Sequence, residues 1–311
     1  RTQGLAQSFP PFNLYNLYPE NSAAMEFTFY YYAPSTAAAV IFTVLFGLSS
    51  LVHLYQLVRT RTWFMIPFFI GVNLETVGYV GRLLSSFESP DFTQGPYIMQ
   101  SALILIAPAF LAASIYMTLG RIIFMLDAEN SSIIKLRWLT KIFVAGDVLS
   151  FLMQASGAGI MVQNSNPSIG EHIIIGGLFV QIIFFGLFSI SAVVFQTRVN
   201  KKPTSRSIEL KGLWTRHMIA LYTTSVLILV RSVIRVAEYL QGYDGYLMRN
   251  EVFIYVFDAL LMFITALVLQ YQHPSEINCL LGRGDKYSEK IVWTRKFIPI
   301  STREMTRSEE V

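Results

Sequence analysis

Seven long apolar runs constrain the fold of this chain more than any other feature. They cover about 36–58, 63–85, 98–120, 138–160, 172–196, 214–240 and 250–272. A helix that crosses the hydrocarbon core of a bilayer needs about 20 mostly apolar residues, and the runs lack the alternation typical of strands. We therefore expect an all-α polytopic membrane protein whose seven-transmembrane-helix bundle occupies residues 36–272.

The composition agrees with this expectation. Hydrophobic residues make up 53% of the 311 residues and charged residues only 14%, whereas soluble domains carry roughly 25% charge. This balance excludes an ordinary soluble enzyme and a disordered chain. The single cysteine, Cys279, excludes an intramolecular disulfide scaffold.

The positions of the basic residues predict how the bundle is oriented. Of the 24 Lys and Arg residues, 19 fall on one side of the predicted spans, two on the other, and three within spans. Cytosolic loops carry the excess of Lys and Arg, so we expect an extracellular segment at 1–35 and a cytosolic tail at 273–311. The same distribution over every cytosolic loop fits anionic lipid headgroups and argues against a nucleic-acid partner.

Ionisable side chains within the spans are the candidate functional residues. Each costs roughly 2.5–3.5 kcal/mol at the bilayer centre, so such groups normally face the bundle interior. A spacing of seven residues places two side chains on one helix face, and it recurs on four spans. The pairs are Glu75 with Arg82, Asp147 with Gln154, Arg231 with Glu238, and Glu251 with Asp258.

We therefore expect spans 2, 4, 6 and 7 to converge on one polar core, a cavity that begins near mid-membrane and opens toward the outer leaflet. Pro67 and Pro108 are expected to remove helix hydrogen bonds and bend spans 2 and 3. The alternative is a set of salt bridges that only fixes helix packing. The substrate-binding residues expected from this pattern are Glu75, Arg82, Asp147, Gln154, Arg231, Arg235, Glu238 and Asp258.

Several of these residues lie in motifs that resemble the fungal RTA-like family, also called lipid-translocating exporters. The resemblance covers roughly residues 30–275. The matching stretches include Tyr32-Ala33-Pro34-Ser35, Glu75-Thr76-Val77-Gly78-Tyr79-Val80-Gly81-Arg82, Ala107-Pro108-Ala109-Phe110, Asp147-Val148-Leu149-Ser150-Phe151, Gln154-Ala155-Ser156-Gly157, Arg231-Ser232-Val233-Ile234-Arg235-Val236-Ala237-Glu238-Tyr239 and Gly242-Tyr243-Asp244-Gly245, followed by Glu251, Tyr255, Asp258 and His273-Pro274.

The resemblance implies a multi-pass plasma-membrane protein of fungi that is linked to resistance to toxic amphiphiles. It implies translocation of amphiphilic lipids such as sphingoid long-chain bases, although family members are also linked to phospholipid asymmetry and porphyrin uptake. In such a protein the acidic side chains would hold an ammonium group, and the arginines would hold phosphate or carboxylate. The expected partners are the amphiphile and membrane lipids, and the sequence leaves the oligomeric state open.

The alternatives to a transporter are a receptor or sensor and an enzyme. A seven-helix receptor or sensor for a lipid shares the expected topology, but the extracellular cysteine pair of many receptors is missing. An enzyme is not expected, because the sequence has no nucleophile elbow. It also has no P-loop, so ATP is not an obvious source of energy. The histidines His53, His172, His217 and His273 lack helical ligand spacing, so neither a metal nor a cofactor is expected.

Overall fold

A computed structural model of the chain describes residues 32–89, 91–163, 167–242, 245–281, 287–290 and 293–296. The predicted extracellular segment lies almost wholly outside the described residues, as does most of the predicted cytosolic tail. Seven helices of the described part are long and apolar enough to cross a membrane. The chain is therefore a multi-pass membrane protein, as the apolar runs predicted.

The spanning helices follow the predicted order. They are α1 (Thr36–Thr60), α2 (Ile66–Phe87), α3 (Gln94–Met125), α4 (Leu136–Gln163), α5 (Pro167–Lys201), α7 (Lys211–Leu240), and a last span built from α9 (Glu251–Ile254), the π-helical turn η4 (Tyr255–Ala259) and α10 (Leu260–Tyr271). Helices α3 and α5 are longer than their predicted apolar runs and extend beyond them at both ends.

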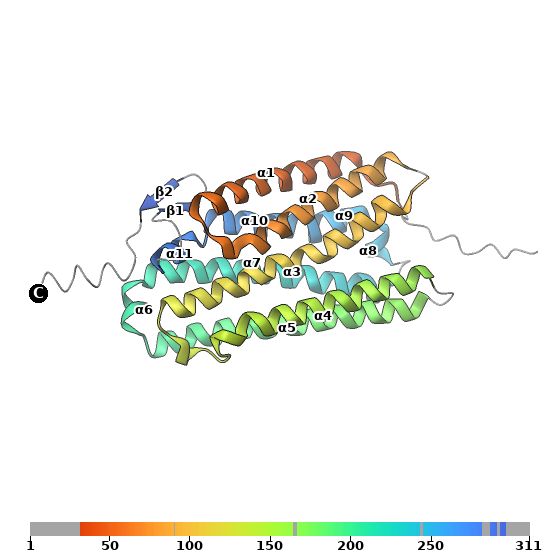
Figure 1. The fold of residues 1–311 in the computed structure, drawn as a ribbon. Coiled ribbons are helices and arrows are strands. Elements are labelled where there is room, and N and C mark those ends of the chain that lie inside the picture. Colours follow the sequence, from red (N-terminus) through yellow and green to blue (C-terminus); the bar gives the residue numbers. More distant parts are fainter. Residues whose placement is uncertain are drawn as a thin grey trace, which may run out of the picture.

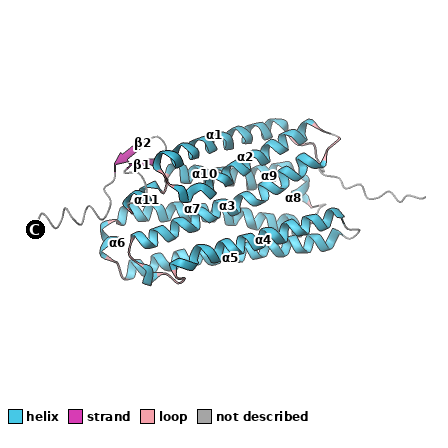
Figure 2. Cartoon of the chain, in the orientation of Figure 1, coloured by secondary structure: helices cyan, strands magenta, loops and turns pink. Residues whose placement is uncertain are grey.

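Shorter elements join and close the bundle (Figure 2). They are η2 (Trp63–Met65), η3 (Glu129–Ser131), α6 (Ser205–Glu209), α8 (Tyr246–Arg249), α11 (Ser275–Leu280) and an antiparallel hairpin of β1 (Tyr287–Lys290) and β2 (Trp293–Lys296). The prediction that Pro67 breaks a helix hydrogen bond is wrong. Pro67 lies in the first turn of α2, where backbone N–H groups have no intrahelical partner to lose.

The helices form an elongated antiparallel bundle (Figure 1). Helices α4 and α5 pack side by side along one edge, α1 and α2 lie at the opposite edge, and α7 packs against α5, α3 and α10. We call the end of the bundle where α1 and α9 begin the proximal end. The distal end is the one where α1 stops at Thr60 and where α6, α11 and the hairpin lie.

Large apolar side chains cover the outside of the bundle. On α5, for example, Ile183, Leu187 and Ile190 are 57%, 51% and 58% exposed. Exposed apolar side chains one helical turn apart are disfavoured in water. They suit contact with lipid chains, which are as apolar as the side chains themselves.

Small residues let α4 and α5 approach each other closely. A Cβ atom added at Gly157 would lie 2.6 Å from the carbonyl oxygen of Gly170, and one added at Gly177 would lie 2.9 Å from that of Ser150. Small residues are typical of such interfaces in membranes, where van der Waals contact between helices takes the place of the hydrophobic effect.

This close approach predicts opposite effects for two glycines of α4. We expect Gly157→Ala to lower the stability of the detergent-solubilised protein by about 1–3 kcal/mol, since the neighbouring backbone must move. Gly159 has open space where its Cβ would be, so Gly159→Ala should leave stability unchanged or raise it by up to about 1 kcal/mol. Thermal unfolding measures both, and equal effects would contradict the packing.

Candidate functional site

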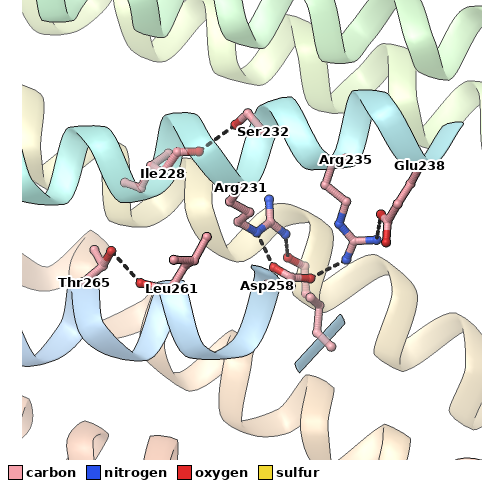
Figure 3. Close-up of polar contacts among 9 residues, drawn as sticks. Ile228, Arg231, Ser232, Arg235, Glu238, Asp258, Leu261 and Thr265 are labelled. Carbon is pink, nitrogen blue, oxygen red and sulfur yellow. Dashed lines mark hydrogen bonds and ion pairs between the residues drawn. The ribbon is translucent and has the colours of Figure 1, made fainter. Parts of the chain in front are cut away.

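Two arginines of α7 share one aspartate in the interior of the bundle (Figure 3). Arg231 donates from Nε to Oδ1 of Asp258, and Arg235 donates from Nη2 to Oδ2. The Arg235 guanidinium also bonds Glu238 on its own helix, at 3.1 Å. We call Arg231, Arg235, Glu238 and Asp258 the arginine–aspartate cluster. Its formal charge is zero, with two cations against two anions.

The position of the cluster on α7 follows from the sequence. Arg231, Arg235 and Glu238 are separated by four and three residues, so they lie along one face, and that face points toward the last span (Figure 3). The side chains of Arg231 and Asp258 are only 2% and 4% exposed. Arg235 is 17% exposed and Glu238 8%, so the members nearer the proximal end are the less buried ones.

Pro108 leaves the carbonyl oxygen of Ile104 free to accept a hydrogen bond from the arginine–aspartate cluster. A proline at position 108 has no N–H to donate to the carbonyl of Ile104, four residues earlier. Arg231 takes this place, because its Nη2 donates to the Ile104 oxygen at 2.9 Å. The helix hydrogen bond that span 3 was expected to lose is therefore replaced by a bond between α3 and α7.

The π-helical turn η4 separates Asp258 from Glu251. The sequence spacing predicted one shared helix face for these two acids. A π turn contains more residues than an α-helical turn, and in the structure the two side chains have different partners. Asp258 bonds the arginines of α7, whereas Glu251 forms an ion pair of 2.7 Å with Arg82.

Arg82 is the centre of a clamp at the proximal end. Besides Glu251, it donates to the hydroxyls of Tyr255 at 2.8 Å and Tyr32 at 2.9 Å. Glu251 in turn accepts the backbone N–H of Ser35, the residue that caps α1. The clamp thus joins the starts of α1 and α9 to α2, while Nη1 of Arg82 is buried without a hydrogen-bond partner among the described residues.

Glu75 differs from every other acid of the polar core. Its side chain is fully buried, yet neither carboxylate oxygen has a hydrogen-bond partner among the described residues. The hydroxyl of Tyr79, one turn further along α2, is likewise buried and unpartnered. Asp258, Arg231 and Arg235 are the charged groups close enough to act on Glu75 electrostatically.

Asp147 and Gln154 lie in a different part of the bundle. Asp147 accepts the hydroxyl proton of Tyr116 on α3 at 2.9 Å. Gln154 donates to Ser150 at 2.7 Å and faces Gln181 on α5. The expected convergence of four spans is therefore only partly correct: spans 2, 6 and 7 bring their charges together, while the polar stripe of span 4 packs against spans 3 and 5.

The distal end holds a polar cluster that the sequence did not reveal. His217 lies 3.1 Å from a carboxylate oxygen of Glu276 and 3.2 Å from the amide nitrogen of Gln272, and His273 lies near both His53 and His217. Glu276 belongs to α11, whose residues are all buried. The available signal was that three of the four histidines occur at the same membrane edge of different spans.

The distal end also contains a hollow and the single cysteine. A hollow of about 760 Å³ is lined by residues of α3, η3, α4 and the loop before α4, among them Arg121, Lys135 and Arg137. Cys279 is buried, which makes this thiol a packed core group. Within the described ranges, no group of three His, Cys, Asp or Glu side chains is arranged to hold a metal ion.

Comparison with known proteins gives a consistent result. The family described as RTA1 like protein matches residues 68–279. Protoporphyrin uptake protein 1 of Saccharomyces cerevisiae is 38% identical over 76% of this chain and 89% of its own length. Protein RTA1 of the same yeast is 38% identical over 80% and 85%. The yeast sphingoid long-chain base transporter RSB1 is 28% identical over 78% and 72%. No solved structure matches the chain.

The arginine–aspartate cluster makes a prediction about energetic coupling. Asp258→Asn leaves two buried guanidinium groups without their shared counterion, and we expect it to lower stability by about 3–5 kcal/mol. In the double variant with Arg231→Gln the loss should be smaller than the sum of the two single losses, by roughly 0.5–3 kcal/mol.

Thermal unfolding of the wild type, both single variants and the double variant measures this coupling. Additive losses would mean that the ion pair between Arg231 and Asp258 does not form in the protein.

Proposed function

This chain belongs to the RTA1-like family, and from that premise we propose that it transports lipid-like amphiphiles across the membrane, with sphingoid long-chain bases as the favoured class. Two relatives support transport, since one is named for protoporphyrin uptake and one for sphingoid long-chain bases. We further propose the orientation that the basic residues favour, with an extracellular N-terminus and a cytosolic C-terminus, and residence in the plasma membrane.

The observation that carries the proposal is the buried charge set itself. A headgroup that crosses hydrocarbon loses its hydration, and burying a charge without a partner is very unfavourable. The arginine–aspartate cluster and Glu75 provide charged groups at about the depth where such a headgroup would need them. Small residues could pack the helices without this desolvation penalty, which favours a role beyond packing.

The less buried half of the cluster is the proposed entrance. Arg235 and Glu238 are the members with partial exposure, and Nε of Arg235 is buried without a hydrogen-bond partner. An ammonium group would bind Glu238, while a hydroxyl or phosphate oxygen would accept from Arg235. Under the proposed orientation, this half faces the outer leaflet, so the cavity would open in that direction.

The structure suggests separate roles for the other predicted site residues. Arg82 positions helices through its clamp with Glu251 and the two tyrosines. Asp147 and Gln154 stabilise the contact of α4 with α3 and α5. Headgroup contact is therefore assigned to Glu75, Arg231, Arg235, Glu238 and Asp258.

Transport in reconstituted vesicles tests the proposal. We expect the wild type to accelerate the movement of a fluorescent sphingoid base between leaflets, and Arg235→Ala to reduce the rate at least about tenfold, since a charge-assisted contact is lost. Arg249→Ala is the matched control, because Arg249 is an exposed cation at the same proximal end and should leave the rate unchanged.

Yeast cells give the parallel readout. Arg235→Ala should remove resistance to the sphingoid base while the protein still reaches the membrane. Binding of the base without any acceleration of its movement would contradict transport and favour the receptor class instead.

A further inference from the structure

In the proximal half, the charged side chains in the interior of α2, α7 and the last span form pairs, with one acid left over. Arg82 faces Glu251, Arg231 faces Asp258, and Arg235 faces both Asp258 and Glu238. Three arginines are thus matched by three carboxylates. Glu75 is the fourth carboxylate of this interior set, and neither of its oxygens has a hydrogen-bond partner among the described residues.

Glu75 also lacks the support that stabilises other buried acids here. Asp147 has no arginine either, but it accepts a hydrogen bond from Tyr116. Both oxygens of Glu75 are buried without any such donor. An ionised carboxylate in this setting has lost its hydration and gained no hydrogen bond in return, so it is stable only with a proton or a bound cation.

We infer that Glu75 is an exchange site, which holds a proton when the site is empty and the ammonium group of the cargo when it is filled. In the exchange, the protonated carboxyl of Glu75 releases its proton to water, and the carboxylate pairs with the ammonium nitrogen. Binding of one singly charged amine therefore releases one proton and leaves the total charge of the site unchanged. This inference rests on the proposed function and adds that transport of the amine is coupled to the movement of a proton.

The surroundings of Glu75 select it over Asp258. Asp258 already forms ion pairs with two guanidinium groups, so it is not the acid left without a partner. The charged groups that act on Glu75 are Asp258 on η4 together with Arg231 and Arg235 on α7. Together with Glu238, these groups carry two positive and two negative charges. No net positive charge is therefore left to neutralise Glu75, and a proton or an ammonium group must do so.

Tyr79 completes a site suited to an amine with a neighbouring hydroxyl. Its unpartnered hydroxyl lies one helical turn from Glu75, and its ring stacks on Phe46 at a centroid distance of 5.6 Å. A hydroxyl donor or acceptor beside a carboxylate matches the amino-alcohol end of a sphingoid base. The aromatic wall provides a surface that also favours a cation.

Counting protons on binding tests the inference. The probe is N,N,N-trimethylsphingosine, whose permanent charge removes any titration of the cargo, added to the full-length protein in lipid nanodiscs. Calorimetry in two buffers with different ionisation enthalpies gives the number of protons released. We expect about one proton per bound amine for the wild type, and an affinity that rises by up to about tenfold per pH unit while Glu75 is protonated.

Variants of Glu75 sharpen the test. Glu75→Gln should bind the amine about tenfold or more weakly, release no proton and show no dependence on pH, whereas Glu75→Asp should keep the proton release. Glu88→Gln, at the end of the same helix, is the matched control and should behave as the wild type.

The outcomes separate the inference from the proposed function. A wild type that binds and transports the amine without releasing a proton overturns the exchange at Glu75 and leaves transport standing. Unchanged proton release in Glu75→Gln does the same. A wild type that neither binds nor moves the amine overturns both. The wild-type proton count needs no variant, so a misfolded variant does not weaken the test.

Discussion

The pairing of Asp258 with two arginines of α7 is the interaction on which the rest of the structure depends. One carboxylate satisfies Arg231 and Arg235 across the contact between α7 and the last span. Arg231 then reaches the carbonyl that Pro108 leaves free on α3. Three spans are thereby tied together at one depth by charged hydrogen bonds, which are stronger than neutral ones and directional. In a bilayer, where hydrophobic burial does not hold helices together, such contacts and close packing fix the arrangement.

Polar side chains divide the bundle into regions with different roles. At the proximal end, Arg82 and Glu251 hold the starts of α1 and α9 in place. On the side of α4 and α5, Asp147 and close helix contacts maintain packing. At the distal end, α11 places Glu276 against His217. The acids Glu251, Asp147 and Glu276 of these regions each accept at least one hydrogen bond. Glu75 accepts none at either oxygen, and because of this contrast we propose that its state changes during transport.

The sequence predicted the helices well and the contacts between them poorly. Apolar runs longer than a bilayer is thick identify spans regardless of neighbours, which is why all seven were found. A seven-residue spacing shows which side chains share a helix face, but it does not show which helix that face meets. Asp147 was expected to face the arginines, but it accepts a hydrogen bond from Tyr116. Asp258 lies in the π turn at Tyr255–Ala259, and no pattern in the sequence marks such a turn. The distal histidines come from different spans, so only the fold brings them together.

The central claim is that a lipid-like headgroup contacts the charges between α2, α7 and η4. Photocrosslinking tests it most directly, with a sphingoid base that carries its photoreactive group beside the amine, followed by mapping of the labelled peptides. The account predicts labels within Ile66–Phe87 of α2 and the second half of Lys211–Leu240 of α7, and their loss when unlabelled sphingoid base competes. Specific labels confined to the distal hollow around Arg121, Lys135 and Arg137 would contradict it.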